Sequence, residues 1–316
     1  MIVVTGGAGF IGSNIVKGLN KAGRDDVFVV DDLTDGKKIK NLVECRLLDY
    51  RDQQDFLMNL LEDHSFEEPI DAIFHEGACS ETTEWNGHYM MQNNYEYSKQ
   101  LLHYCVNRHI PFIYASSAAV YGAGKQFSVG DDNEKPLNVY GYSKWLFDQY
   151  VLRQSATFDS PVVGLRYFNV YGPQESHKGK MASVAFHLMH QLCDTGRVKL
   201  FEGCDGYDNG EQRRDFVYVD DVVNVNLWLL DNPHIAGIFN VGTGESRSFN
   251  AIAQTLIAEH GSGILEYIPF PDHLKGAYQS FTEADMSGLR NAGYREAFCS
   301  LEVGLKAYYH WFKNSR

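Results

Sequence analysis

A tyrosine and a lysine four residues apart, Tyr140 and Lys144, are the first side chains in the sequence that could do acid/base chemistry together. Residues four apart share one face of a helix, so these two are expected to point the same way, whereas Tyr142 points elsewhere. A phenol with a pKa of about 10 is a poor base at neutral pH, but a neighbouring ammonium stabilises the phenolate and lowers that pKa. The spacing indicates a general acid/base at Tyr140, although it also occurs on ordinary solvated helices.

A serine at the end of a predicted strand extends this constellation. Residues 111–115 read as a buried strand, and Ser117 follows two positions later. Open α/β sheets bind ligands at the carboxyl ends of their strands. Ser117 is therefore placed to donate a hydrogen bond to a reacting oxygen.

A glycine-rich turn near the start of the chain is expected to hold a cofactor beside these groups. Residues 2–4 read as a short buried strand, and apolar residues at helical spacing follow the turn. Gly6, Gly9 and Gly12 allow a tight turn, close approach of the backbone to a pyrophosphate, and close packing of helix on strand. The alternative is an ordinary buried strand–helix turn. The context favours a dinucleotide whose pyrophosphate lies on the helix N-terminus.

The end of the second predicted strand carries signals for two nicotinamide cofactors. Residues 27–30 lead into Asp31 and Asp32, and a carboxylate at this position favours the free ribose hydroxyl of NAD. Lys38 follows closely, and a nearby cation favours the 2′-phosphate of NADP. Loop lysines are commonly just solvated, so the sequence alone leaves both cofactors open. Lys144 could reach the nicotinamide ribose in either case.

Composition limits the class of protein. The chain has 316 residues, 44% of them hydrophobic, which suffices for one large core or for two domains that share a cleft. A net charge of −13 argues against nucleic-acid binding, and no apolar run approaches the length of a membrane span. The 12 histidines form no metal-ligand spacing and the six cysteines no CxxC pair, so we expect no metal and reduced thiols. With a strand predicted from residue 2, we expect no signal peptide and a cytoplasmic protein.

The alternation of predicted strands and helices along the chain predicts an α/β fold. We expect a doubly wound parallel sheet of the Rossmann type and a smaller α/β substrate-binding domain. The region 89–106 reads as one long helix within the first domain. We expect the cofactor-binding domain in 1–173, with returns at about 216–245. The substrate-binding domain is expected in 174–215 and 246–316.

Several blocks of the sequence resemble the extended short-chain dehydrogenase/reductase family, also called the NAD-dependent epimerase/dehydratase family. The resemblance runs essentially end to end and is carried by the glycine turn, residues 117–122, the Tyr140/Lys144 pair, and residues 166–173 and 214–221.

Longer blocks resemble one group within that family, the ADP-L-glycero-D-manno-heptose 6-epimerases. These blocks are residues 75–85, 134–140, 177–179, 181–187 and 267–271. The resemblance implies an isomerase of lipopolysaccharide core biosynthesis that epimerises an ADP-heptose at C6 with bound NADP. It also implies a homo-oligomer, specifically a homopentamer.

The resemblance further implies roles for individual residues. Tyr140 and Lys178 would be two acid/base groups, with Ser117 and Lys144 beside Tyr140. Cofactor contacts would come from Gly6, Gly9, Phe10, Ile11, Gly12, Asp31, Asp32, Lys38, Gln53, Glu76, Gly77, Ala78, Cys79, Ser80, Asn93, Lys144, Val170 and Lys178. Substrate contacts would come from Ser117, Asn169, Lys180, His187, Phe201, Glu202, Gly203, Cys204, Arg214 and Tyr278.

Some positions depart from the group's pattern. Gln53 stands where a cofactor-binding lysine is usual and Asp32 where an amide is usual, and both changes weaken the preference for NADP. Lys180 stands where a small residue is usual. The stretch 205–212 is longer than usual, which affects the nucleotide end of the pocket.

Epimerisation at an exocyclic carbon explains the need for two acid/base groups. If C6 is oxidised and the ketone turns about the C5–C6 bond, its oxygen moves across the pocket, out of reach of a single group. Lys178 is the second candidate, although a lysine in a glycine-flanked loop is ordinarily a solvated charge. His187 and Lys180 are fallback candidates.

Rival functions are a nucleotide-sugar 4-epimerase or 4,6-dehydratase of the same family, or a non-catalytic cofactor sensor. Such dehydratases carry an Asp-Glu pair where Ala118 and Ala119 follow Ser117, and sensors often lose the Tyr/Lys pair, which is intact here.

Overall fold

The computed structural model describes residues 1–62, 66, 68–271 and 278–315, without the side chain of residue 131. The chain forms two compact units, each assembled from three stretches. Unit 1 comprises Met1–Val120, Pro136–Arg166 and Val223–Phe239; unit 2 comprises Tyr121–Lys135, Tyr167–Val222 and Asn240–Arg316. These compact units divide the chain at Tyr167 and place residues 121–135 in unit 2. The boundary between functional domains at residue 173 stays a prediction.

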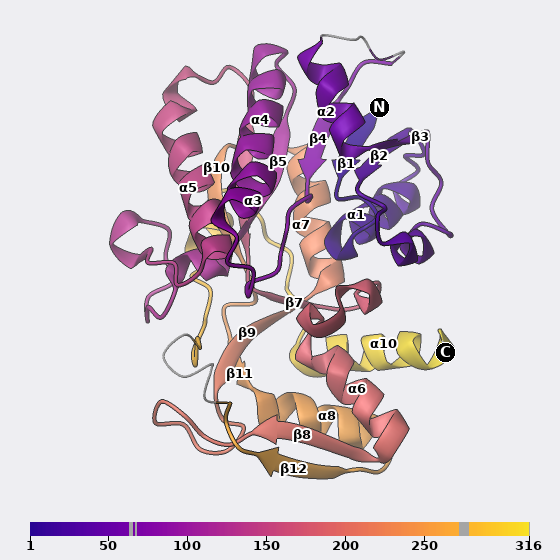
Figure 1. Cartoon of the computed structure of the whole chain (residues 1–316), viewed down its shortest axis with the longest axis vertical. Coiled ribbons are helices and arrows are strands. Elements are labelled where there is room, and N and C mark those ends of the chain that lie inside the picture. The colour runs from indigo at the N-terminus through magenta and orange to yellow at the C-terminus, as the bar shows by residue number, and fades with distance from the viewer. Residues whose placement is uncertain (63–65, 67, 272–277, 316) are drawn as a thin grey trace. The chain divides into compact units, whose positions relative to one another are not determined.

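A seven-stranded sheet forms the centre of unit 1 (Figure 1). Its strands are β1 (Ile2–Thr5), β2 (Val27–Asp31), β3 (Asp49–Asp52), β4 (Ala72–His75), β5 (Phe112–Ser117), β6 (Val162–Tyr167) and β10 (Gly237–Val241). Their order is β10-β6-β5-β4-β1-β2-β3, and the neighbours from β3 to β5 pair in parallel. This order confirms the predicted doubly wound sheet, in which ligands bind where the strand order reverses between β1 and β4.

Helices cover this sheet. They are α1 (Phe10–Lys21), α2 (Gln53–Leu61), α3 (Gly87–Met91), α4 (Tyr97–Asn107), α5 (Val139–Gln154) and α7 (Val219–Asp231), with short 3-10 turns at Gly36–Asn41, Ala118–Tyr121 and Ser155–Thr157. A π-helical segment, Gln92–Glu96, separates α3 from α4. The predicted continuous helix 89–106 is thus interrupted by one wider turn.

The core of unit 1 explains why its inner strands are mostly apolar. Parallel strands buried on both faces need hydrophobic side chains on both, as in β1 and β2, which are apolar up to their last residue. On one face Phe28, Phe56, Phe112 and Phe147 pack in a single cluster with residues of α2, α4 and α5. On α1, a Cβ at Gly18 would lie 2.5 Å from the side chain of Val223, so glycine allows α1 and α7 to pack closely.

The described residues of unit 2 form two small sheets, four α-helices and a 3-10 turn at Asp131–Asn133. The strands β7 (Asn169–Tyr171), β9 (Arg213–Tyr218) and β11 (Ser246–Ser248) form one sheet, and β8 (Arg197–Phe201) and β12 (Ile264–Ile268) form the other. The helices are α6 (Val184–Thr195), α8 (Phe249–His260), α9 (Ser287–Asn291) and α10 (Leu301–Asn314), with a 3-10 segment at Ser176–Met181. Of the expected return at 216–245, β10 joins the seven-stranded sheet and β9 lies in unit 2.

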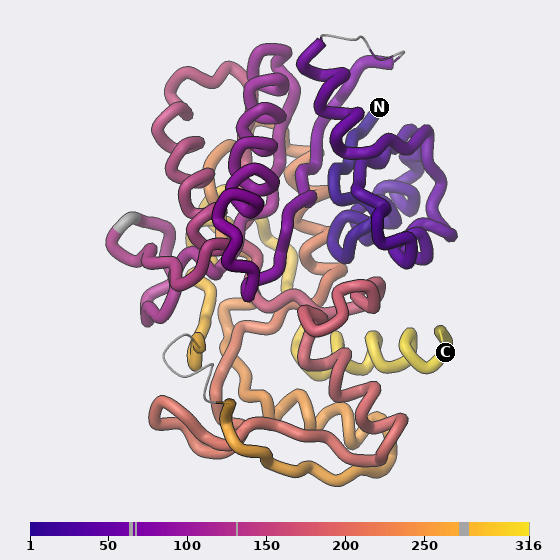
Figure 2. The backbone as a smooth tube through the Cα atoms, in the orientation of Figure 1, coloured from indigo at the N-terminus to yellow at the C-terminus, as the bar shows by residue number. Residues whose placement is uncertain are grey.

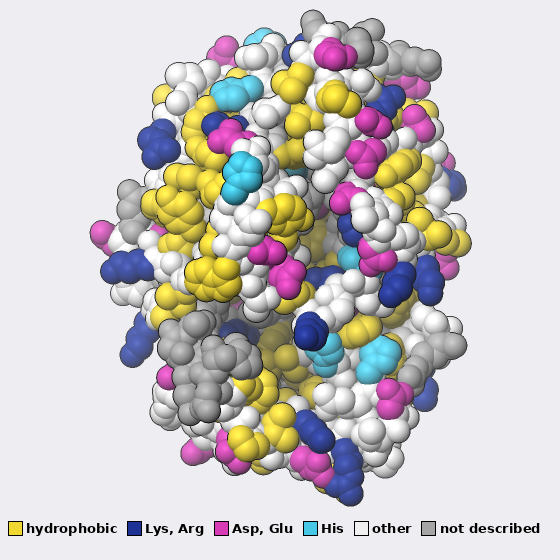
Figure 3. Space-filling view, in the orientation of Figure 1, with side chains coloured by type: hydrophobic (Ala, Val, Ile, Leu, Met, Phe, Trp, Pro, Cys, Tyr) yellow, Lys and Arg dark blue, Asp and Glu magenta, His cyan; other side chains and the backbone are white. Residues whose placement is uncertain are grey.

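The described surface is mixed in charge. On the face shown in Figure 3, acidic and basic side chains are interspersed with polar and hydrophobic ones rather than gathered by sign. Among the described helices, none is both long enough and apolar enough to cross a membrane.

Candidate active site

The glycine-rich turn has no room for side chains. Gly6 adopts a φ of +67°, and a Cβ there would lie 2.5 Å from the backbone nitrogen of Gly77, at the end of β4. A Cβ on Gly12 would lie 2.2 Å from the carbonyl oxygen of Gly6, and the amide of Gly9 donates to that same oxygen at 2.9 Å. Helix α1 starts directly after Gly9, which supplies no capping side chain. The amides of its first turn are therefore suited to a pyrophosphate, and the residues present fit a dinucleotide.

Two carboxylates and a lysine meet at the end of β2. Asp31 accepts hydrogen bonds from the amide of Ala8 at 2.8 Å and from Nζ of Lys38 at 2.9 Å. The same Nζ donates to the carbonyl oxygen of Asp32 at 3.0 Å. The hydroxyl and amide of Thr34 and the charge of Lys38 lower the pKa of Asp32. Lys38 thus lies at the position predicted for ribose or phosphate recognition, held by Asp31.

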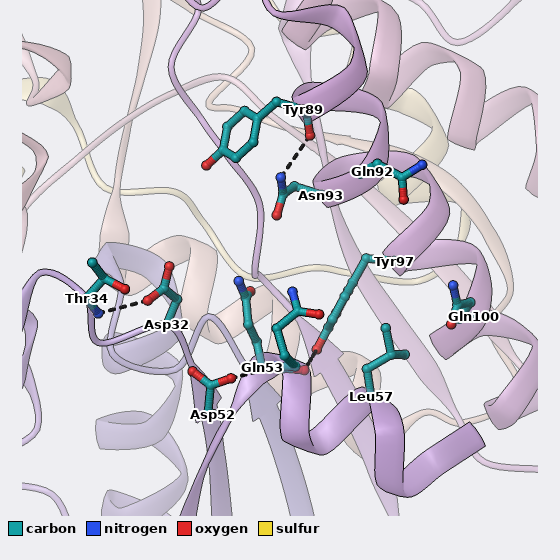
Figure 4. Close-up of a pocket in the computed structure, with 11 residues that line it drawn as sticks. Asp32, Thr34, Asp52, Gln53, Leu57, Tyr89, Gln92, Asn93, Tyr97 and Gln100 are labelled. Carbon is teal, nitrogen blue, oxygen red and sulfur yellow. Dashed lines mark hydrogen bonds between the residues drawn. The ribbon is translucent and has the colours of Figure 1, made fainter. Parts of the chain in front are cut away.

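A cavity of about 550 Å³ opens in unit 1 (Figure 4). The amide side chain of Asn93, from the π-helical segment, donates to the carbonyl oxygen of Tyr89 at 2.8 Å, and the hydroxyl of Tyr97 donates to that of Gln53 at 3.2 Å. Three predicted cofactor residues therefore share one cavity. The lining residues are Asp32, Thr34, Asp52, Gln53, Gln54, Leu57, Tyr89, Gln92, Asn93, Tyr97 and Gln100.

One asparagine that the sequence reasoning missed fixes the loop after β4. The side chain of Asn94 accepts from the amide of Cys79 at 2.8 Å and donates to its carbonyl oxygen at 2.9 Å. It also donates to Oγ of Ser143 at 3.1 Å, and that hydroxyl donates to the carbonyl oxygen of Tyr140. Asn94 therefore links the predicted cofactor loop 76–80 to the first turn of α5. Its place in the π-helical segment accords with the frequent occurrence of such turns at functional sites.

Ser117, Tyr140 and Lys144 come together as predicted. Asn138 caps α5, because its side chain accepts from the amide of Gly141 at 2.7 Å. Tyr140 lies in the first turn, and the Ser117 hydroxyl forms a hydrogen bond with its phenol. Lys144, one turn later, is 4% exposed and donates to the carbonyl oxygen of Ala115 at 2.8 Å.

The electrostatics of this trio differ from the sequence-based expectation. Burial raises the pKa of Tyr140, and the hydrogen bond from Ser117 lowers it by less. Burial lowers the pKa of Lys144 to about 8, against the charges of Glu76 and Asp148, which raise it. Burial outweighs the hydrogen bond, so the pKa of Tyr140 is raised and not lowered as the sequence predicted. A phenol with a raised pKa holds its proton more firmly, which suits a group that donates one.

A buried ion pair anchors the helix that carries Tyr140 and Lys144. Asp148, one turn beyond Lys144, accepts from Nε of Arg166 at 2.8 Å, and both side chains are 0% exposed. It also accepts from the hydroxyls of Ser116 at 2.8 Å and Tyr114 at 2.9 Å. Since Ser116 and Tyr114 belong to β5 and Arg166 to β6, this carboxylate fixes α5 against the strand that ends in Ser117.

Part of the predicted substrate set clusters in unit 2. Arg214 on β9 is 7% exposed, and its guanidinium lies 4.8 Å from the ring centroid of Tyr278. The ring of Phe270, which sequence reasoning did not select, contacts those of Tyr278 and Phe201, with centroid distances of 5.2 and 5.5 Å. Burial lowers the pKa of Arg214. Phe201, Arg214 and Tyr278 therefore form one aromatic and cationic cluster through Phe270, and Glu202, Gly203 and Cys204 follow Phe201 directly in the chain.

The remaining predicted residues of unit 2 lie elsewhere. Asn169 and Val170 belong to β7, and His187 to the first turn of α6. Lys178 and Lys180 both lie in the 3-10 segment, where Lys180 is exposed and Lys178 partly buried. Burial lowers the pKa of Lys178, and the charge of Glu175 raises it. Tyr140 and Lys178 belong to different units, so their proximity stays a prediction.

The described part of the chain has no group of side chains arranged to bind a metal ion. Within those residues there is no cluster of three or more histidine, cysteine, aspartate or glutamate side chains that could hold an ion.

Comparison with known proteins identifies the family. The chain is 58% identical over 308 residues to an ADP-L-glycero-D-manno-heptose-6-epimerase of Alkalilimnicola ehrlichii, covering 98% of this chain and 96% of that relative. The crystal structure of the Helicobacter pylori enzyme of the same name matches with a TM-score of 0.86 at 34% identity, covering 99% of this chain and 96% of that one. A UDP-glucose 4-epimerase from Thermotoga maritima matches with a TM-score of 0.82 at 29% identity, covering 99% of each chain.

The model of the NAD dependent epimerase/dehydratase family matches residues 2–242. This match spans the glycine turn, the β2 carboxylates and the Ser117, Tyr140 and Lys144 trio, and it supports a nicotinamide cofactor. Both the match and the relatives confirm the resemblance seen in the sequence: the chain belongs to the NAD dependent epimerase/dehydratase family.

Proposed function

We propose that this protein interconverts ADP-D-glycero-D-manno-heptose and ADP-L-glycero-D-manno-heptose by inverting C6. The observation that carries the proposal is the 58% identity, along nearly the whole of both chains, to a relative named for this reaction. The identity includes the unit 2 regions in which substrate recognition is expected. The assembled Ser117, Tyr140 and Lys144 support a catalytic protein rather than a sensor.

The bound nicotinamide ring would supply the chemistry that side chains lack, because it can accept and return a hydrogen with its electron pair. Tyr140 would exchange the proton of the C6 oxygen, with Ser117 donating a hydrogen bond to that oxygen. Lys144, whose Nζ donates to the carbonyl oxygen of Ala115, would hold the nicotinamide ribose. After the C6 ketone turns about the C5–C6 bond, Lys178 would exchange the proton at the second oxygen position.

The chain's own residues support this division of labour. Burial lowers the pKa of Lys178, which makes a neutral amine more accessible near neutral pH than for a solvated lysine. Burial raises the pKa of Tyr140, which suits a group that donates a proton. Burial thus shifts both pKa values in the direction that favours the uncharged form, a phenol at Tyr140 and an amine at Lys178, and such a pair can serve the two directions of one reversible reaction.

NADP is the cofactor that we propose, with NAD as the alternative. Lys38 supplies a cation at the end of β2 for a 2′-phosphate. Asp32 and Gln53 favour the unphosphorylated ribose, because neither gives a phosphate a positive partner. We further propose a cytoplasmic homo-oligomer, a homopentamer by resemblance, that binds neither nucleic acid nor membrane.

The test is to incubate the pure protein with ADP-D-glycero-D-manno-heptose in D₂O and follow the C6 configuration by NMR. We expect a mixture of both epimers with no deuterium at C6, because the hydrogen that leaves is the one that returns. Deuterium at C6 would indicate exchange with solvent and a different mechanism. No change with this sugar, but turnover of UDP-glucose, would favour the 4-epimerase alternative that the Thermotoga maritima match raises.

A further inference from the structure

A buried glutamate lies directly before the segment that carries Lys178. Glu175 is 0% exposed, and the 3-10 segment Ser176–Met181 follows it. The carbonyl oxygen of Glu175 accepts the amide of Lys178 at 3.0 Å. The backbone of the lysine is thus bonded to the backbone of the glutamate.

The carboxylate of Glu175 joins three parts of unit 2. It accepts from the amide and hydroxyl of Ser183, at 2.5 and 2.6 Å, and from the amide of Gly172 at 3.5 Å. The hydroxyl of Tyr308 on α10 donates to the same group at 2.9 Å. Gly172 precedes the Lys178 segment and Ser183 follows it, so one carboxylate closes both ends of that segment. Figure 2 shows the C-terminal helix beside this part of the chain.

The segment itself needs such support. Short 3-10 turns have poorer hydrogen-bond geometry than α-helix and rarely hold their shape alone. Gln174 and Gly179 have φ values of +76° and +53°, in the left-handed region, and a Cβ at Gly179 would meet nothing within 4 Å. A regular helix therefore does not fix this conformation. Two backbone hydrogen bonds, from Lys178 to Glu175 and from Ala182 to Gly179 at 3.2 Å, act together with the Glu175 carboxylate to hold it.

We propose that Glu175 is a positioning residue for Lys178, holding the segment so that the amine acts at one defined place. The inference rests on the proposed function, because it concerns the second acid/base group of that reaction. Because Glu175 is fully buried, we do not expect it to contact substrate. Its effect should therefore appear only in steps that use Lys178, and not in steps that use Tyr140.

A surrogate substrate separates the two groups. An ADP-hexose with an aldehyde at C6 can dismutate: two aldehydes and one water give one carboxylic acid and one alcohol, with no net change in the cofactor. Tyr140→Phe leaves this reaction to Lys178, and Lys178→Met leaves it to Tyr140. Glu175→Gln is then added to each of these two parent variants. Each comparison, with and without Glu175→Gln, then differs only by an amide in place of the carboxylate.

We expect Glu175→Gln to lower kcat for dismutation about 10–100-fold in the Tyr140→Phe parent, since small misplacements of a reacting group cost up to about 100-fold. In the Lys178→Met parent the change should stay below about twofold. KM should be unchanged in both. Glu296→Gln, at an exposed carboxylate of unit 2, should change neither parent. Tyr308→Phe removes a single donor and should give a weaker loss with the same dependence on the parent.

Equal losses in both parents, or none in either, would overturn the positioning role. If Glu175→Gln does not fold, Tyr308→Phe decides by the same comparison. Failure of the proposed function looks different, because the unmutated protein would then neither epimerise the ADP-heptose nor dismutate the aldehyde.

Discussion

Replacing Asp148 by asparagine should destabilise the protein strongly although the side chain keeps its shape. The amide retains one acceptor oxygen but loses the negative charge opposite Arg166, and both side chains are 0% exposed. Breaking a buried ion pair from one side costs about 3–5 kcal/mol, because the remaining charge is left uncompensated. The hydrogen bonds from Ser116 and Tyr114 cannot both be kept at full strength.

The measurement is urea unfolding at a fixed, saturating cofactor concentration, because bound cofactor adds its own stabilisation. Asp159→Asn, at an exposed carboxylate in the same unit, is the control and should stay within about 0.5 kcal/mol of the unmutated protein. The double replacement Asp148→Leu/Arg166→Met removes both charges and should recover most of the loss. A loss below about 1 kcal/mol for Asp148→Asn would refute the conclusion that this pair fixes α5.

Three further results are expected. Tyr140→Phe should lower epimerisation about 10²–10⁴-fold while the fold and bound cofactor survive, and near-normal turnover would make Tyr140 a packing residue. The nucleotide released by denaturation should be mainly NADP. Lys38→Met should shift the NADP/NAD ratio toward NAD, and Gln53→Lys should shift it toward NADP. If the unmutated protein releases NAD alone, Lys38 does not bind a 2′-phosphate. Burial lowers the pKa of His75 from 6.5 to about 3. On acidification, His75 therefore takes up a proton in the unfolded chain before it does so in the folded protein, and the folded protein loses stability as the pH falls below 6.5. Between about pH 7.5 and 5.5 the unmutated protein should lose about 1.4 kcal/mol more than His75→Asn, and equal losses would show that His75 does not titrate as a buried neutral group.

The sequence was most informative where spacing alone specifies a local structure. The glycine turn and the doubly wound parallel sheet were predictable because buried parallel strands are largely apolar and the turn needs glycine for close contacts. The trio of Ser117, Tyr140 and Lys144 followed from one strand end and one helical turn.

Contacts between distant positions were not predictable from spacing. Nothing in the spacing of Asp148 and Arg166 marks them as partners, and only the packing of α5 on β6 makes them a pair. Glu175 was missed for the same reason, since its partner Tyr308 lies 133 residues further on. The opposing pKa shifts of Tyr140 and Lys144 depend on burial, which the sequence does not give. The roles of the site residues stay predictions.

The interleaved path of the chain has a consequence for synthesis on the ribosome. Unit 1 needs residues up to Phe239, and unit 2 needs the stretch from Asn240 onward. At about 5–20 residues per second, residues 240–316 emerge roughly 4–15 s after unit 1 has all its parts. During that interval Glu175 has been synthesised but Tyr308 has not. The Glu175 carboxylate of the nascent chain therefore lacks one of the hydrogen-bond donors that it has in the folded protein. Catalytic competence should therefore arise only after α10 has been synthesised, and truncations within α10 should yield a chain that binds cofactor but does not turn over.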